Sequence, residues 1–268
     1  MRRALLVLAL AALATGCPPK PRVLKVCADP NNLPFSNARG EGFENRLVEL
    51  VARDLKARVE YTWWAQRRGY VRNTLKAGRC DIWPGVASQV EMLGTTQPYY
   101  RSTYVFVSRA DRNLDVASYD DPRLKGLTIG VQMIGDDASN TPPTHALARR
   151  GIIQNVRGYM LYGDYSQPNP PADVVKAVDR GDIDMAVAWG PLAGYFAKQA
   201  AHPLRLTPVQ PWLDGPQWPM VFDISMGVRK DDPKLRDELD QVLERRAPEI
   251  RSLLAQYGVP VVPDSAGG

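Results

Sequence analysis

Apolar residues near the start of the chain fall into two successive patterns. Residues 23–27 carry four apolar side chains, and the polar residues 29–32 end this run, as expected for a buried strand followed by a turn. Between residues 43 and 55, apolar residues recur at steps of three and four, which places them on one face of a helix. A strand, a polar turn and a helix open a βαβ unit, and the loop after such a strand faces the ligand crevice of a parallel sheet.

The same patterns continue to the C-terminus and divide into two units. The first unit is predicted to contain strands at 58–63, 80–83 and 104–107 and a helix that ends at Gly78. The second is predicted to contain a strand at 127–131, a helix from Pro142, a strand or connection at 152–156, a helix at 171–178, a strand at 182–188 and a helix at 193–201. A crossing at 212–219, a return strand at 222–229 and two amphipathic helices between 235 and 254 follow. This order predicts two α/β lobes, formed by residues 17–107 with 222–268 and by residues 108–221.

The N-terminal residues have the pattern of an export signal. Arg2 and Arg3 precede an apolar run over residues 4–14, which is too short to span a bilayer. Small residues follow, and Cys17 comes directly after a glycine. These features predict a signal peptide over residues 1–16, a periplasmic location and a lipid anchor at Cys17.

Composition and charge describe an ordinary globular protein. Of the 268 residues, 44% are hydrophobic and 24% are charged. Removal of the predicted signal peptide takes away two arginines and lowers the net charge from +5 to +3. So mild a charge gives no electrostatic reason to expect a nucleic-acid partner.

The cysteines fit an oxidising compartment. Once Cys17 is acylated, Cys27 and Cys80 remain as an even pair, and such a pair in the periplasm favours a disulfide. Two buried free thiols are the alternative. No metal site is expected, because His145 and His202 lack the close spacing to these cysteines that zinc ligation uses.

Several phrases spread along the chain resemble a type II periplasmic solute-binding protein. They lie at 24–34, 75–81, 97–100, 124–131, 181–187 and 226–230. The resemblance implies two α/β lobes joined by two crossing hinge strands, with a ligand cleft between the lobes.

A narrower resemblance is carried by residues 27–35, 63–69, 72–75 and 140–143. These segments resemble the binding-protein-like accessory proteins associated with quinoprotein (PQQ-dependent) methanol and alcohol dehydrogenases, the MoxJ/XoxJ type. The resemblance implies a periplasmic partner of such a dehydrogenase, needed for its maturation or activation.

Two departures from amino-acid-binding relatives argue against an amino-acid ligand. Those relatives have an arginine before the Pro-Tyr segment that pairs with the ligand carboxylate, but residues 88–93 contain none. They also have an aspartate that takes the ligand ammonium, and Trp189 stands in its place. Both charged anchors of an amino-acid site are therefore missing.

Nine residues at predicted strand ends, or in the loops that follow, are candidates for a ligand or partner cleft: Asp29, Phe35, Trp64, Arg67, Arg68, Trp83, Tyr99, Asn140 and Trp189. Aromatic faces with guanidinium groups suit a flat or anionic group, or the side chains of a partner. A solvated loop is an equal alternative for Trp64, Arg67 and Arg68, and Asn140 also fits the cap of an ordinary helix.

The chain carries no Gly-x-Ser-x-Gly elbow, no phosphate-binding Gly-rich loop with Lys-Ser/Thr and no His-Glu-x-x-His motif. Asp29 with Glu44 could imitate an acid–base pair, but nothing in their spacing demands it. We therefore expect a non-catalytic, monomeric protein without a cofactor of its own, which binds a PQQ-dependent dehydrogenase. The alternative is a receptor of an ABC importer for a small aromatic or carboxylic ligand.

Overall fold

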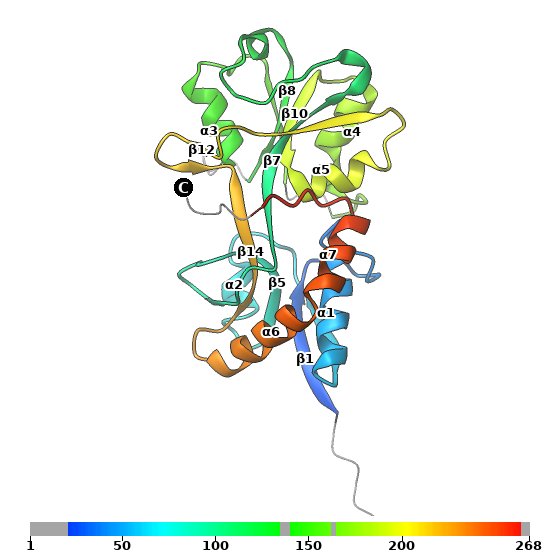
Figure 1. Cartoon of the computed structure of the whole chain (residues 1–268), viewed down its shortest axis with the longest axis vertical. Helices are drawn as coiled ribbons and strands as arrows, with labels where there is room; N and C mark the ends of the chain where they lie inside the picture. Colours follow the sequence, from blue (N-terminus) through cyan, green and yellow to red (C-terminus); the bar gives the residue numbers. More distant parts are fainter. Residues whose placement is uncertain (1–20, 135–139, 162–164, 264–268) are drawn as a thin grey trace, which may run out of the picture.

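The computed structural model describes residues 21–134, 140–161 and 165–263 of the chain. The predicted signal peptide and the lipidation site at Cys17 lie outside these residues. Two α/β lobes lie one above the other, as predicted, and strands β7 and β14 run between them (Figure 1). Not one of the described helices is both long and apolar enough to cross a membrane.

The first lobe contains β1 (Arg22–Ala28), β2 (Asn31–Asn32), β3 (Ser36–Asn37), α1 (Phe43–Asp54), β4 (Ala57–Trp63), α2 (Tyr70–Asn73), β5 (Ile82–Ala87), β6 (Gly94–Thr95), β14 (Val221–Val228), α6 (Pro233–Arg245) and α7 (Ala247–Gln256). The second lobe contains the 3-10 helices η1 (Ala110–Arg112), η2 (Pro122–Gly126) and η3 (Pro170–Ala172), the helices α3 (Pro142–Arg149), α4 (Asp173–Arg180) and α5 (Gly190–Ala197), and the strands β8 (Ile129–Met133), β9 (Val156–Met160), β10 (Met185–Trp189), β11 (Leu204–Pro208), β12 (Leu213–Asp214) and β13 (Trp218–Pro219). Strand β7 (Tyr100–Arg109) belongs to both.

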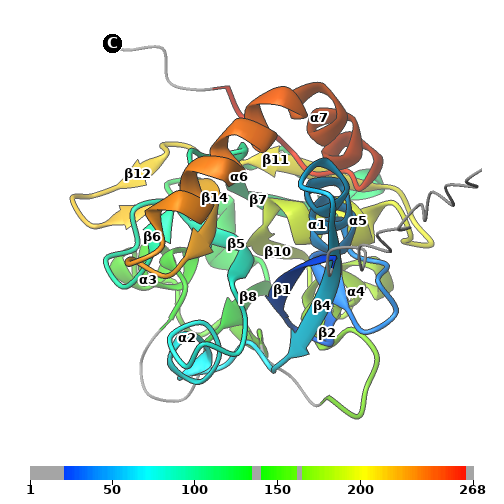
Figure 2. The ribbon, with the colours of Figure 1, turned by 90° about the horizontal axis from the view of Figure 1, so that it is seen from below.

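Strand β1 lies inside the first-lobe sheet, with β4 and β5 as parallel neighbours. Its side chains alternate between two cores, as the pleat of a strand requires. Leu24 and Val26 pack against α1, α6 and α7, whereas Cys27 packs on the opposite face. Figure 2 shows the same division, with α6 and α7 on one side of the sheet and α2 on the other. The loop after β1 consequently leaves from the middle of the sheet.

Strand β7 joins the two lobes. Residues Tyr100–Thr103 pair with β14 in the first lobe, and residues from Tyr104 onward pair with β10 in the second. The predicted lobe boundary lies after residue 107, whereas β7 exchanges its neighbours between 103 and 104. The returning chain crosses beside it, where the Tyr104 N–H donates to the Met220 carbonyl at 2.9 Å.

The C-terminal segment makes a third connection between the lobes. Ser102 Oγ donates to the Pro260 carbonyl at 2.6 Å. Next to this bond, Gly194 of α5 lies so close to the chain that an added Cβ would be 1.9 Å from the Gly258 carbonyl oxygen. The lobes are therefore held together at their hinge side by three stretches of chain.

One helix and two strands depart from the sequence prediction. The helix expected to end at Gly78 is α2, which ends at Asn73 and is followed by turns. Strand β5 does not end at Trp83 but runs through Pro84 and Gly85, because the β14 ladder has a register shift at this point that needs no N–H from the proline. Strand β11 was not predicted at all. It pairs antiparallel with the second half of β7 and covers the edge that β7 would otherwise expose.

Candidate functional site

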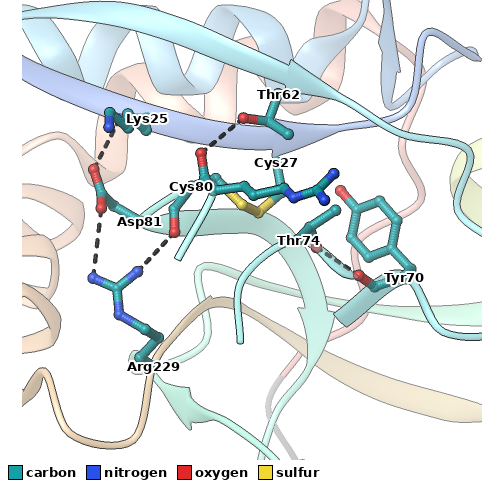
Figure 3. Close-up of a disulfide and its surroundings, with 9 residues drawn as sticks. Lys25, Cys27, Thr62, Tyr70, Thr74, Cys80, Asp81 and Arg229 are labelled. Atoms are coloured by element: carbon teal, nitrogen blue, oxygen red, sulfur yellow. Dashed lines mark hydrogen bonds and ion pairs between the residues drawn. A yellow bond between two sulfur atoms is a disulfide. The ribbon is translucent and has the colours of Figure 1, made fainter. Parts of the chain in front are cut away.

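The disulfide predicted for Cys27 and Cys80 is confirmed, with a Cα–Cα distance of 5.5 Å (Figure 3). Both cysteines are fully buried, at the end of β1 and just before β5. Arg229, directly after β14, donates to the Cys80 carbonyl at 2.7 Å and also approaches Asp81 at 3.5 Å. The crosslink thus fixes the start of β5 to the end of β1.

A cavity of about 290 Å³ lies between the lobes. Five aromatic rings line it: Phe35, Tyr100, Tyr104, Trp189 and Phe222. Its polar lining comes from Asn32, Glu44, Gln66, Gln132 and Thr141, and its remaining lining residues are Gly85, Leu161 and Ile224. No lysine, arginine or aspartate stands among these described lining residues, so the cavity offers no charged anchor for an amino acid.

Glu44 is the one carboxyl group in this lining, and only 7% of the residue is exposed. It lies in the first turn of α1, on the buried face of the helix. Burial, with a smaller contribution from the charge of Asp29, raises the pKa of Glu44 to about 8. The group is therefore mostly neutral at pH 7 and can donate a hydrogen bond as well as accept one.

Gly85 of β5 makes the room that Glu44 occupies. A Cβ at this position would lie 1.9 Å from Glu44 Oε1, a distance that side chains do not adopt. Gly85→Ala is therefore expected to destabilise the protein by about 1–3 kcal/mol through overpacking. Because the clash is with one side chain, a Glu44→Ala background should recover part of this loss.

Urea titration of the wild type, both single variants and the double variant measures this coupling. Gly227→Ala is the matched control, because its nearest contacts, beginning at 3.0 Å, come from other side chains and not from Glu44. Strict additivity of Gly85→Ala and Glu44→Ala would contradict the expected contact.

Gln132 supplies a free donor on the second-lobe side of the cavity. Only 2% of the residue is exposed, and its Nε2 has no hydrogen-bond partner in the described structure. Its Oε1 accepts from the Trp189 backbone N–H at 3.3 Å, which fixes the orientation of the amide. A buried donor without a partner costs free energy, so a ligand acceptor placed here would be favoured.

Asp29, a predicted cleft residue, lies outside the cavity lining and ties the lobes together. Its carboxylate accepts from the Gln66 N–H at 2.7 Å and from the Tyr165 hydroxyl of the second lobe at 2.6 Å. Asn31 Nδ2 likewise donates to the Gln167 carbonyl at 2.8 Å. We call these contacts between residues 29–33 and 165–169 the interlobe latch.

Four other predicted residues lie toward the cavity or behind its wall. Phe35 and Trp189 line it, and Asn140 precedes the lining residue Thr141. Tyr99 instead is turned away, and its hydroxyl donates to the Pro84 carbonyl at 3.0 Å.

The remaining four predicted residues belong to the first lobe, and Trp64 and Trp83 among them pack against the buried cluster around the disulfide. Trp64 carries the Arg79 guanidinium over its ring at 5.2 Å, and Trp83 packs against Tyr70 at 5.0 Å. Arg67 lies over the Tyr165 ring at 4.8 Å, and Arg68 is exposed. None of the four lines the interlobe cavity.

Sequence reasoning missed Glu44 and Gln132 as cavity residues. For Glu44 a signal was present, because it occupies the same helix face as Val48 and Val51, which are apolar. For Gln132 the surrounding strand carried no comparable signal. In the described ranges, no three histidine, cysteine, aspartate or glutamate residues gather as a metal site would require.

The two lobes, the hinge strands and the enclosed cavity define a binding protein of the periplasmic type. The sequence profile of the bacterial extracellular solute-binding proteins, family 3, matches residues 24–258. The protein MoxJ of Methylorubrum extorquens is 35% identical over 264 residues, which cover 94% of this chain and 86% of that protein. The chain belongs to this solute-binding family and, within it, to the MoxJ/XoxJ type.

Solved structures agree with this placement and confirm the predicted type II fold. The periplasmic binding protein XoxJ from Methylobacterium extorquens AM1 has 36% identity and a TM-score of 0.74, over 90% of this chain and all of that one. MxaJ from Methlophaga aminisulfidivorans MPT has 27% identity and a TM-score of 0.75, over 89% of this chain and all of that one. These matches support a periplasmic location.

Proposed function

We propose that this protein is an accessory factor that binds a PQQ-dependent methanol or alcohol dehydrogenase in the periplasm and assists its maturation or activation. The observation that carries the proposal is the cavity lining. It lies between the two lobes, its described residues include no lysine, arginine or aspartate, and its one carboxyl group is largely neutral. Similarity to MoxJ and XoxJ over nine-tenths of the chain supports the same function.

The proposed role is not catalytic. The carboxylate of Asp29 accepts hydrogen bonds from the N–H groups of Asn31 and Gln66 and from the Tyr165 hydroxyl. The bond from Tyr165 joins the two lobes. Glu44, whose pKa burial raises to about 8, is mostly neutral at pH 7 and lies against Gly85. Two carboxyl groups used in this way support a structural role better than general acid–base chemistry.

The protein would act in the periplasm, either free or anchored to a membrane. Residues 1–16 would direct export, and a lipid anchor at Cys17 would tether the folded part to a membrane. Binding of one protein conformation in preference to another would let the factor stabilise an open, cofactor-accepting form of the dehydrogenase.

Deletion of the gene tests this proposal in the cell. We expect the deletion strain to contain dehydrogenase polypeptide with much reduced PQQ loading and activity, because the accepting form is no longer stabilised. Periplasmic extracts are assayed for activity and for bound PQQ, and a plasmid copy of the wild-type gene serves as the control. Unchanged PQQ loading in the deletion strain would contradict the proposal.

A solute receptor remains the second candidate, favoured by the unpartnered Gln132 donor in the cavity. Together with neutral Glu44, this donor fits a small aromatic ligand, or a carboxylic acid in its uncharged form, with an acceptor oxygen. A thermal-shift panel of such compounds separates the two candidates, because tight ligand binding to the folded state raises the unfolding midpoint.

A further inference from the structure

One stretch of the first lobe carries positive charge without any negative charge. Residues 64–79 contain five basic residues and no acidic residue: Arg67, Arg68, Arg72, Lys76 and Arg79. All five are exposed. Arg72, Lys76 and Arg79 form no ion pair within the described ranges, although charged surface residues elsewhere in the chain are frequently paired.

This stretch borders a groove on the surface. A cavity of about 480 Å³ has Arg67, Arg72 and Lys76 along its lining, with the rings of Tyr70 and Trp83. Met92, which is 52% exposed, closes one side of it. No acidic residue belongs to this described lining, so the groove is cationic with an apolar wall.

A second cavity of about 530 Å³ continues the first, since Lys76 and Met92 line both. It adds Arg229 and Lys230 to the cationic lining, together with the acidic residues Glu91 and Asp231. We call the two cavities together the basic groove. Because it continues over two cavities and its lining is both cationic and apolar, it suits an extended segment of chain.

The basic groove is rigidly supported. Tyr70 and Leu75 pack with Cys27 and Cys80 in one buried cluster around the disulfide. Thr74 Oγ1 donates to the Tyr70 carbonyl at 2.6 Å and closes the turn after α2 (Figure 3). The groove is therefore already ordered in the free protein, so binding of a partner would cost little conformational entropy there.

We infer that the basic groove docks an acidic segment on the surface of the partner protein, with one apolar side chain of that segment seated against Met92 and Trp83. The inference rests on the proposed function, because it names the surface through which the partner is held. Arg72 and Lys76, which form no ion pair among the described residues, attract a complementary acidic surface, and an apolar contact beside them holds it. Gln66 lines both the basic groove and the interlobe cavity, so the docked segment lies beside the mouth of the cleft.

The test measures binding of the full mature protein to the PQQ-dependent dehydrogenase purified from the same bacterium. The variant Arg72→Glu with Lys76→Glu reverses two charges of the groove. Lys125→Glu with Arg251→Glu makes the same change in net charge at two exposed residues of η2 and α7 that form no ion pair among the residues described. Circular dichroism and the thermal midpoint confirm that both variants are folded.

We expect the groove variant to bind about tenfold more weakly than the wild type, because two attractive contacts become repulsive. The control variant should stay within about twofold, and added salt should weaken wild-type binding more than binding of the groove variant. Equal binding by wild type and groove variant would overturn the inference while leaving the accessory function intact. Absence of binding by the wild type would overturn both.

Discussion

Replacing Cys27 and Cys80 together by alanine is expected to lower the free energy of unfolding by about 4 kcal/mol at 25 °C. The disulfide joins residues 53 positions apart, so its removal returns a large loop entropy to the unfolded chain. Both cysteines are fully buried in the cluster that supports the basic groove, and their loss also removes packing there. Guanidinium titration of the purified variant and the wild type measures the difference.

The wild type after reduction is the control for this double substitution. Reduction removes the crosslink without shortening any side chain, so most of the expected loss should appear there too. A reduced wild type as stable as the oxidised protein would show that the crosslink contributes little and that the expected mechanism is wrong.

As the pH rises from 5 to 8, the free energy of unfolding of Glu44→Gln is expected to increase steadily relative to that of the wild type. The pKa of Glu44 is about 8 in the folded protein and near 4.5 when unfolded. Between these values the folded state holds a proton that the unfolded state has released, so wild-type stability falls with rising pH. Glutamine does not titrate, so the variant does not lose stability in this way. The wild-type loss in free energy of unfolding is at most about 1.4 kcal/mol per pH unit.

Thermal unfolding of both proteins at pH 5, 6.5 and 8 measures the effect. Glu244→Gln, which changes an exposed glutamate of α6, is the matched control and should follow the wild type at every pH. A constant difference between Glu44→Gln and the wild type across this range would contradict a neutral Glu44 in the folded protein.

The sequence was sufficient for most of the fold because the periodic segments are long and well separated. The helix expected between residues 43 and 55 is α1, and the strand expected at 58–63 is most of β4. The prediction failed where tertiary pairing overrode local signals. Pro84 continues a strand because the ladder of β14 shifts register beside it, and β11 is held by β7 more than by its own sequence.

The cleft was harder to predict because strand order is invisible in the sequence. Strand β4 is the edge of the sheet, and the loop that follows it brings Gln66 to the cavity but leaves Trp64, Arg67 and Arg68 outside the lining. Strand β1 is internal, and its loop brings Phe35 to the cavity. Glu44 fits into the cavity wall because β5 has Gly85 opposite it, and no pattern within α1 reveals that neighbour.

The basic groove, the interlobe latch and the cavity adjoin one another on one face of the cleft. Gln66 lines both cavities, and its N–H donates to Asp29 of the latch. A partner segment in the groove would therefore contact the loop that holds the lobes together. A bound segment that favours the lobes with the latch contacts formed, over the lobes with these contacts broken, would couple docking to lobe closure.

Affinity capture of the mature, tagged protein from its native periplasm, followed by mass spectrometry of the captured proteins and small molecules, tests the accessory function most directly. An accessory factor should bring down a PQQ-dependent dehydrogenase in stoichiometric amount, with no small molecule retained in the cavity. A small molecule retained at one per chain without any dehydrogenase would contradict the accessory function and identify a solute receptor.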